Sequence, residues 1–221
     1  MNIREYFNDW WPIIDKVELR NVVSKVDSVY QIKECSPKKP EIFKAFTLCS
    51  RKDCRVIFIG QDPYPQRGVA TGLLFANSKE QKILSPSLNI VKNCILDLEN
   101  PNKIRIFDQT LESIARQGVL LLNSALTVEV NNPGSHQLMW SPFMRKFLIN
   151  ISEVETGIIY VLFGNTAKSL KPFIGKYNHI IECIHPAYCA RNNLKLPDVF
   201  TEVNKLLLYQ YGECIHWCEE L

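Results

Sequence analysis

Polar side chains that could form a catalytic or binding site follow each of four apolar runs in the sequence. These residues are Asp62, Asn123, Asn165 and His185. A carboxylate can orient water or stabilise a cation, a carboxamide can donate and accept hydrogen bonds, and an imidazole can donate one. Taken one at a time, such residues usually form turns or cap loops. Their recurrence after all four runs indicates one shared site.

The four runs are short and rich in β-branched residues, which is typical of buried parallel strands. They span residues 55–60, 119–123, 158–164 and 179–185, and helical patterns lie between them. Strands that alternate with helices predict a single domain over residues 1–221 with an α/β fold, a three-layer parallel α/β/α sandwich. Ligands of such sheets bind beyond the carboxyl ends of the strands, so this fold would gather Asp62, Asn123 and His185 on one rim.

Several helix boundaries can be predicted from capping residues. Gly118 and Gly212 are expected to end helices over residues 111–117 and 197–211, and the N-terminal third of the chain has helical patterns. Two further helices are expected to begin with a capping serine followed by proline, at Ser85 and Pro86 and at Ser141 and Pro142. Apolar residues recur at helical spacing after each start, namely Leu88, Val91, Ile95 and Leu98, and Phe143, Phe147, Ile149 and Ile151.

The composition is that of an ordinary globular protein. Hydrophobic residues make up 46% and charged residues 22% of the 221 residues, which excludes disordered, collagen-like and fibrous classes. The 26 basic and 23 acidic residues give a net charge of +3, too small to indicate or to exclude a nucleic-acid binder. The start of the chain lacks the features of a signal peptide, and no apolar run approaches the ~20 residues of a membrane span. We therefore expect a cytoplasmic protein with its eight cysteines reduced.

Nucleotide-binding and metal sites find less support in the sequence. The glycine fingerprints of dinucleotide and triphosphate sites and the Gly-x-Ser-x-Gly elbow of serine hydrolases are absent. A metal centre is the stronger alternative because four cysteines and two histidines lie near one another in the sequence. Their spacings differ from those of zinc ribbons, and one of the cysteines lies within an apolar run, so no metal site is expected. The residues concerned are Cys183, His185, Cys189, Cys214, His216 and Cys218.

Four motifs resemble those of one known family. They are residues 60–64 (GQDPY), 68–75 (GVATGLLF), 121–128 (LLNSALTV) and 184–186 (IHP). Together they resemble the GQDPY-type (family 1) uracil-DNA glycosylases, and the resemblance extends from residues 36–46 through Gly134, His136 and Trp140 to His216 and Trp217. It implies a central four-stranded parallel sheet and a monomeric DNA repair enzyme without metal or cofactor. Such an enzyme hydrolyses the N-glycosidic bond of uracil in DNA, releasing uracil and leaving an abasic site for base excision repair.

The resemblance also implies catalytic roles around a uracil that is flipped out of the DNA. Asp62 would orient water and stabilise the cationic sugar, and His185 would donate a hydrogen bond from a neutral imidazole to uracil O2. Asn123 would pair with N3–H and O4 of uracil and mismatch cytosine. The two charges that develop on bond cleavage would thus meet different partners.

The remaining implied contacts shape the pocket and hold the DNA. Phe75 would stack on the base, although a core phenylalanine fits the sequence equally well. Tyr64 would exclude the methyl group of thymine, and Gln61 would help to place water or a phosphate. The DNA backbone would be held by groups that do not read its sequence. The residues implied are Ser85, Ser87, Gly164, Asn165, Tyr188, Cys189 and Arg191.

Three positions depart from the family pattern. Pro65 stands where the family has histidine, at little expected cost because the position lies beside the pocket, and Asn165 replaces a serine. Cys189 stands in place of a leucine that wedges into the space left by the flipped base, a gap that Tyr188 or Arg191 could fill. Our hypothesis is that flipping is assisted less strongly, so that uracil is excised faster from single-stranded than from duplex DNA. Equal rates would count against this.

Two other functions fit parts of the sequence. A non-catalytic DNA-binding scaffold on a glycosylase fold would bind DNA without releasing uracil, and an enzyme of free nucleotides would turn over mononucleotides. The combination of Asp62, Asn123 and His185 argues against the scaffold. The expected partners are uracil-containing DNA, single- or double-stranded, and as a further candidate a DNA-mimicking protein inhibitor. Because the net charge is small, the DNA face must be locally basic, with Lys168, Lys171 and Arg191 as candidates.

Overall fold

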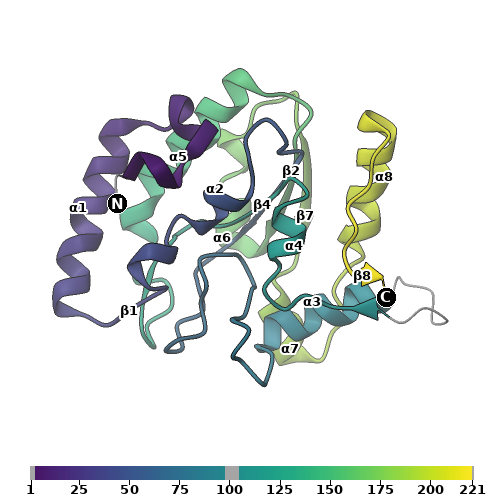
Figure 1. The fold of residues 1–221 in the computed structure, drawn as a ribbon, viewed down its shortest axis with the longest axis horizontal. Coiled ribbons are helices and arrows are strands. Elements are labelled where there is room, and N and C mark those ends of the chain that lie inside the picture. The colour runs from purple at the N-terminus through teal and green to yellow at the C-terminus, as the bar shows by residue number, and fades with distance from the viewer. Residues whose placement is uncertain (1–2, 98–104, 221) are drawn as a thin grey trace.

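Four parallel strands form the central sheet, and each coincides with a run predicted from the sequence (Figure 1). They are β2 (Val56–Gly60), β4 (Val119–Asn123), β6 (Ile159–Phe163) and β7 (His179–Cys183), in the spatial order β4-β2-β6-β7. The structure is a computed structural model that describes residues 3–97 and 105–220. Every residue of β2, β4 and β6 is buried, as expected for strands covered on both faces.

The fourth strand is less buried than its apolar sequence predicts. β7 lies at the edge of the sheet, where β6 is its one partner among the described strands. Ile181 and Cys183 on one face are buried, whereas Glu182 on the other face is exposed and Ile180 is half-buried. This exposure accompanies the edge position of β7, and an apolar run by itself does not reveal the position of a strand in the sheet.

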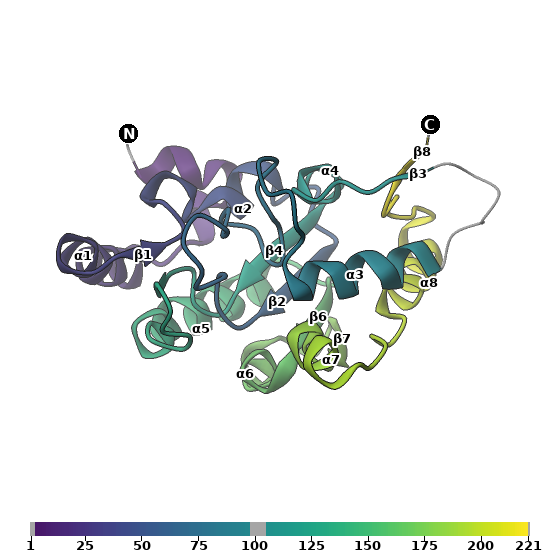
Figure 2. The ribbon, with the colours of Figure 1, turned by 90° about the horizontal axis from the view of Figure 1, so that it is seen from below.

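Helices cover both faces of the sheet and make the three-layer α/β/α sandwich predicted from the sequence. They are α1 (Lys16–Ile32), α2 (Lys44–Leu48), α3 (Pro86–Asp97), α4 (Glu112–Ala115), α5 (Gln137–Val154), α6 (Gly164–Lys168), α7 (Pro186–Asn192) and α8 (Val199–Tyr211). Figure 2 shows α2 and α4 on one side of the sheet and α5 and α6 on the other. The N-terminal third of the chain is largely helical, which confirms its prediction.

Smaller elements complete the described chain. Short 3-10 helices cover Ile3–Tyr6, Asn8–Ile13, Lys39–Glu41 and Lys171–Phe173. Two antiparallel pairs join distant segments: β1 (Cys35–Ser36) pairs with β5 (Val128–Glu129), and β3 (Arg105–Ile106) pairs with β8 (Glu219–Glu220). The second pair ties the C-terminal segment back to the chain that precedes α4.

The boundaries of α3 and α8 largely follow their predictions. α3 begins at Pro86, and α8 ends at Gly212, whose φ of 71° is a left-handed conformation that glycine adopts without strain. Of the apolar stripe predicted for α3, Leu98 lies outside the described residues, and the buried members are Leu88, Val91 and Ile95. Local capping signals therefore account for these two helix ends.

The predicted start of α5 at Ser141 and Pro142 is wrong. The helix begins at Gln137, and Pro142 lies inside it on the exposed side. The carbonyl of His136 accepts a hydrogen bond from Trp140 N at 3.1 Å, so a turn of helix forms ahead of the proline. Trp140 is fully buried, and its packing supplies the tertiary contact that a capping pattern does not contain.

α4 is shorter than the helix predicted over residues 111–117. Leu111 has a φ of 53°, which excludes it from the helix. Gly118 has a φ of 91°, and its carbonyl accepts hydrogen bonds from Arg55 N at 3.0 Å and Val56 N at 3.2 Å. A Cβ at Gly118 would lie 2.2 Å from Asp53 O, so this glycine permits two chain segments to meet beside the sheet rather than simply ending α4.

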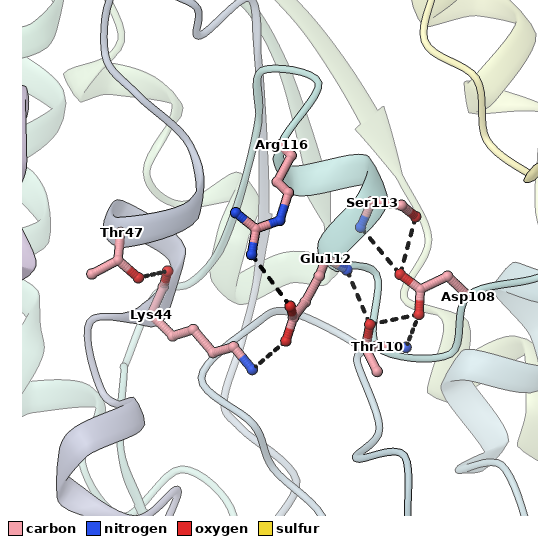
Figure 3. Close-up of polar contacts among 7 residues, drawn as sticks. All are labelled: Lys44, Thr47, Asp108, Thr110, Glu112, Ser113 and Arg116. Carbon is pink, nitrogen blue, oxygen red and sulfur yellow. Dashed lines mark hydrogen bonds and ion pairs between the residues drawn. The ribbon is translucent and has the colours of Figure 1, made fainter.

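A polar network fixes the start of α4 and ties it to α2 (Figure 3). Asp108 accepts hydrogen bonds from the backbone N of Thr110 at 2.8 Å and of Ser113 at 3.1 Å. Burial alone would raise the pKa of Asp108, but these donors and the hydroxyls of the same two residues lower it below its ordinary value. Glu112 in turn pairs with Lys44 of α2 at 2.8 Å. These contacts stabilise a helix that is too short to form by itself.

Five cysteines of the described residues are buried and pack as small apolar side chains, namely Cys49, Cys54, Cys183, Cys189 and Cys218. Burial raises the pKa of Cys183 to about 12. Within residues 3–97 and 105–220, no three His, Cys, Asp or Glu side chains come together as metal ligands. None of the described helices is long and apolar enough to cross a membrane.

Candidate active site

Sheet register places the polar strand ends side by side. Gly60 at the end of β2 pairs with Asn123 at the end of β4. A Cβ built on Gly60 would lie 3.0 Å from Asn123 Oδ1, and one built on Gly164 would lie 3.0 Å from His185 Cβ. Asp62 is near enough to His185 for its charge to act on the imidazole. The structure therefore brings Asp62, Asn123 and His185 to one rim of the sheet.

The Asp62 carboxylate is held by donors from three parts of the chain. Oδ2 accepts hydrogen bonds from Gly134 N at 2.7 Å and from Gln61 Nε2 at 2.9 Å, and Oδ1 accepts one from Gln137 Nε2. Gln61 is held in turn, since its Oε1 accepts a hydrogen bond from Thr166 Oγ1 at 3.0 Å. Every contact supplies a donor, as an ionised carboxylate requires, so the group is oriented before any ligand arrives.

The side chain of Asn123 carries an unpaired acceptor. The residue is only 6% exposed, and its Oδ1 is buried without a hydrogen-bond partner among residues 3–97 and 105–220. Leaving a buried acceptor unpaired costs about 1 to 3 kcal/mol, so a ligand that donates a hydrogen bond to Oδ1 would recover this free energy. A planar ligand that offers an N–H donor on one edge suits this position.

His185 is a neutral imidazole with a defined tautomer. It caps the N-terminus of α7, where Nδ1 accepts a hydrogen bond from Ala187 N at 3.1 Å. Nδ1 therefore has no proton in the neutral ring, and Nε2 carries it as a donor. Burial, assisted by the positive charge of Arg191 and opposed by Asp62, lowers the pKa of His185 to about 4. At neutral pH the group can donate a hydrogen bond without bringing a positive charge.

Two aromatic residues line the same rim. The ring of Phe75 is edge-on to His185 at a centroid distance of 5.6 Å and to Phe163 at 5.1 Å. Phe75 has a φ of 63°, an unusual conformation for a residue with a Cβ, and Tyr64 donates a hydrogen bond from its hydroxyl to Phe75 O at 2.8 Å. Phe75 thus belongs to the buried core and contacts the site as well, so the two interpretations of its sequence are compatible.

Comparisons with known proteins show the family to which the chain belongs. The family model of the uracil DNA glycosylase superfamily matches residues 46–208. A uracil-DNA glycosylase of Campylobacter lari is 36% identical over 194 residues, covering 87% of this chain and 83% of the relative. One of Fusobacterium nucleatum is 33% identical over 222 residues, covering 95% of each chain. The chain belongs to the uracil DNA glycosylase superfamily.

Solved structures of glycosylases share the fold of this superfamily member. Mimivirus uracil-DNA glycosylase matches with a TM-score of 0.81 at 22% identity, covering 98% of this chain and 87% of that chain. A single-residue variant of the mimivirus enzyme, solved in complex with UGI, has a TM-score of 0.80 at 21% identity, with 96% and 87% covered. The UNG of Nitratifractor salsuginis has a TM-score of 0.67 at 20% identity, with 93% and 92% covered. At these identities the likeness supports the fold, a single α/β domain.

The sequence analysis assigned no role to several residues that hold the site of this glycosylase superfamily member. Gln137 and Ser124 contact the segment of Gln61 and Asp62, and Thr166 contacts Gln61. Gln137 follows a motif that the sequence analysis singled out, but its partners lie 75 and 76 residues away along the chain. No spacing rule relates residues at such separations, so only the fold brings these groups together.

The residues predicted to touch the DNA backbone fall into two groups by exposure. Ser85 is half-buried and held by Asn77, whose Oδ1 accepts from Ser85 N at 2.9 Å and whose Nδ2 donates to Ser85 Oγ at 2.8 Å. Ser87 is buried and its hydroxyl lies against that of Tyr64. The side chain of Ser87 is therefore less accessible than that of Ser85, and contact of either residue with DNA through its hydroxyl or backbone N–H stays a prediction.

The residues of α6 and α7 that were predicted to contact DNA also differ in exposure. Asn165, Tyr188 and Arg191 are exposed, with Tyr188 at 49%. Cys189 is fully buried, and its Sγ lies 3.8 Å from Lys195 O. The helix turns the side chain of Cys189 toward the core, and contact of this residue with DNA stays a prediction. The neighbouring Tyr188 points outward instead.

Proposed function

We propose that this chain is a GQDPY-type (family 1) uracil-DNA glycosylase that acts in base excision repair. It hydrolyses the N-glycosidic bond of uracil in DNA, releases free uracil and leaves an abasic site. The observation that carries the proposal is the buried, unpaired Oδ1 of Asn123 on the same rim as the Asp62 carboxylate and the neutral His185. Membership of the uracil DNA glycosylase superfamily supports the reaction.

Asn123 selects uracil in this proposal. Its Oδ1 accepts the N3–H of uracil and its amide group donates to O4, whereas cytosine presents an acceptor at N3 and a donor at C4. Cytosine would leave buried groups unpaired, which can give a discrimination of about 10⁴ to 10⁵. Tyr64, stiffened by Pro63 and Pro65 and held through its hydroxyl, stands against C5 and excludes the methyl group of thymine. Phe75 offers its ring to the flipped base.

Asp62 and His185 share the chemistry of bond cleavage. The sugar acquires oxocarbenium character and the departing base acquires negative charge. Asp62, with three donors fixing its carboxylate, lies on the sugar side, where it orients water and stabilises the cation. His185 lies on the base side and donates from Nε2 to uracil O2, and Gln61 helps to place the water. These steps draw only on side chains of the chain itself.

Exposed groups around the rim hold the DNA in this proposal. The backbone is contacted by Ser85, Gly164, Asn165 and Arg191, and the duplex or single strand is accepted with its target base flipped. The complex of the mimivirus variant with the protein inhibitor UGI supports a second partner, a DNA-mimicking inhibitor that would cover the same rim. We further propose that the enzyme works as a cytoplasmic monomer.

The proposed activity is tested with a labelled oligonucleotide that contains one uracil and is treated with alkali after incubation. The wild-type chain is expected to create alkali-sensitive sites and to release free uracil without added metal. Asp62→Asn and His185→Ala should each slow excision by about 10²- to 10⁴-fold. DNA binding without uracil release would instead identify a scaffold, and turnover of mononucleotides would identify an enzyme of free nucleotides.

Tyr188 is proposed to fill the gap left by the flipped base, because it is exposed while Cys189 is buried. We expect excision to be faster from single-stranded than from duplex DNA. Tyr188→Ala should lower the rate on duplex DNA several-fold more than the rate on a single strand, measured as the ratio of single-turnover rates on the same sequence. Tyr177→Ala removes another exposed tyrosine and is the matched control. An unchanged ratio in Tyr188→Ala would overturn this role.

A further inference from the structure

Gln137 joins the ends of the first two central strands at the catalytic carboxylate. Its Nε2 donates to Asp62 Oδ1 and lies 2.8 Å from Gln61 O, and its Oε1 lies 3.0 Å from Ser124 Oγ. Gln61 and Asp62 follow β2, Ser124 follows β4, and Gln137 is the first residue of α5. One half-buried carboxamide therefore contacts three residues at the exits of two strands.

The orientation of this carboxamide is determined by its neighbours. Asp62 Oδ1 and Gln61 O can only accept hydrogen bonds, so the NH₂ end of Gln137 must face them. The oxygen end then faces Ser124 Oγ, which can donate to it or to Gln61 O at 2.9 Å. A reversed amide would place the acceptor Gln137 Oε1 against two other acceptors, Asp62 Oδ1 and Gln61 O. The contacts with Gln61, Asp62 and Ser124 together therefore require that Gln137 direct its NH₂ group toward Asp62.

The number of donors around Asp62 limits what else can bind it. An ionised carboxylate has about four acceptor positions. Gly134 N, Gln61 Nε2 and Gln137 Nε2 occupy three of them, and of the residues that the structure describes only Gln137 binds Oδ1. One position therefore remains for a water molecule, and its direction is set by the donors that fill the others.

We propose that Gln137 is a positioning residue for uracil excision, which fixes the rotation of the Asp62 carboxylate so that its remaining acceptor position faces the attacking water. Gln137 touches neither the base nor the sugar in this proposal and acts only through Asp62. The inference rests on the proposed function, because it assigns the catalytic carboxylate of that reaction.

The test measures single-turnover excision and DNA affinity for Gln137→Ala. A misplaced carboxylate should lower the excision rate about 10- to 100-fold. The Kd for uracil-containing DNA is measured in the Asp62→Asn background, where turnover is slow, and should stay within about twofold of its value with Gln137 present. Gln137→Glu keeps the shape of the side chain but replaces the donor by an anionic oxygen next to Asp62. It should lower the rate at least as much as Gln137→Ala.

A double variant separates positioning from a general loss of structure. In Asp62→Asn, the further change Gln137→Ala should slow the residual reaction less than twofold, because the group through which Gln137 acts has gone. A purely structural effect would slow both backgrounds equally. Gln117→Ala is the matched control, since Gln117 also bridges two segments through its amide, to Ser113 O and His216 O, away from Asp62.

The outcomes distinguish this inference from the proposed function. No uracil release by the wild-type chain would overturn the proposed function. Wild-type release with unchanged rates in Gln137→Ala and Gln137→Glu, or an equal loss in both Asp62 backgrounds, would overturn the role of Gln137 alone.

Discussion

At the scale of single residues, the site keeps groups that folding alone would not favour. The buried Oδ1 of Asn123 has no hydrogen-bond partner in the described part of the chain, and the half-buried imidazole of His185 is held neutral. The first feature reduces the stability of the free protein because a buried polar group without a partner costs free energy. The second reduces it as the pH falls below about 6.5, where the unfolded chain binds a proton that the folded imidazole does not. Their presence on one rim is therefore better explained by a ligand than by packing.

Asn123→Leu should separate function from stability. The substitution removes the unpaired acceptor while keeping a similar shape, so the free energy of unfolding should rise by about 0.5 to 1 kcal/mol. Uracil excision should fall by about 10²-fold or more, because the contacts to N3–H and O4 are lost. Urea unfolding and the oligonucleotide assay measure the two effects. A stability loss greater than about 1 kcal/mol would show that Oδ1 is satisfied in the free protein.

His185 should titrate near pH 4. Its folded-state pKa of about 4 lies below the ordinary value of 6.5, so protonation favours the unfolded chain. The stability linked to this group is fully present above about pH 6.5 and is lost as the pH falls toward 4. NMR of the imidazole nitrogens should show a proton on Nε2 at pH 7, and Arg191→Ala should raise the titration midpoint by removing a positive charge. A wild-type midpoint above pH 6 would contradict the neutral donor.

At the scale of elements, strand-to-helix turns set the positions of the catalytic groups. Gly164 follows β6 with a φ of 82°, and its Cα faces His185 so closely that a Cβ would lie 3.0 Å from His185 Cβ. His185 itself follows β7 and caps α7. The distance between these two turns therefore determines where the imidazole lies relative to Asp62 and Asn123.

Gly164→Ala tests that relation, with Gly212→Ala as its control. Both glycines have positive φ, so each alanine should lower the free energy of unfolding by about 1 to 2 kcal/mol. A Cβ at Gly212 meets nothing within 4 Å, whereas one at Gly164 presses on His185. Only Gly164→Ala should therefore also slow excision, by roughly 10-fold or more. Equal excision rates in the two variants, at a temperature where both are folded, would show that excision does not depend on the close approach of Gly164 to His185.

At the scale of the whole molecule, the proposed substrate is a polyanion, whereas the net charge of the chain is small. The chain carries +3 overall, so attraction to DNA depends on where the basic residues lie. Of the three candidates, Arg191 is exposed on α7 near the site, whereas Lys171 makes an ion pair with Glu182 at 2.6 Å. The negative charge of Glu182 offsets the attraction of Lys171 for a phosphate.

DNA affinity should therefore fall steeply with salt despite the modest charge. About four phosphate contacts predict a loss of roughly 100-fold between 50 and 200 mM monovalent salt. Arg191→Ala should reduce the slope of log Kd against log salt by about 1, and Lys171→Ala should reduce it less. Fluorescence anisotropy with a uracil-containing oligonucleotide in the Asp62→Asn background measures the slopes. A flat salt dependence would argue for a small-molecule substrate.

Much of the molecule follows from its sequence because the relevant signals are local. Apolar runs located all four central strands, the alternation of strands and helices indicated the sandwich, and strand direction alone placed Asp62, Asn123 and His185 on one rim. The ends of α3 and α8 followed from Pro86 and Gly212, whose effects act over one turn of helix.

Only the tertiary structure decided the features that depend on distant segments. The burial of Trp140 starts α5 ahead of Pro142, the packing of α7 turns Cys189 inward and leaves Tyr188 exposed, and the fold carries Gln137 to Asp62 across 75 residues of chain. Residue types and short spacings encode backbone preferences over a few positions, whereas these contacts are set by how whole elements pack. The sequence thus predicted the polar side chains on the rim, but it did not predict the groups that hold those side chains in place.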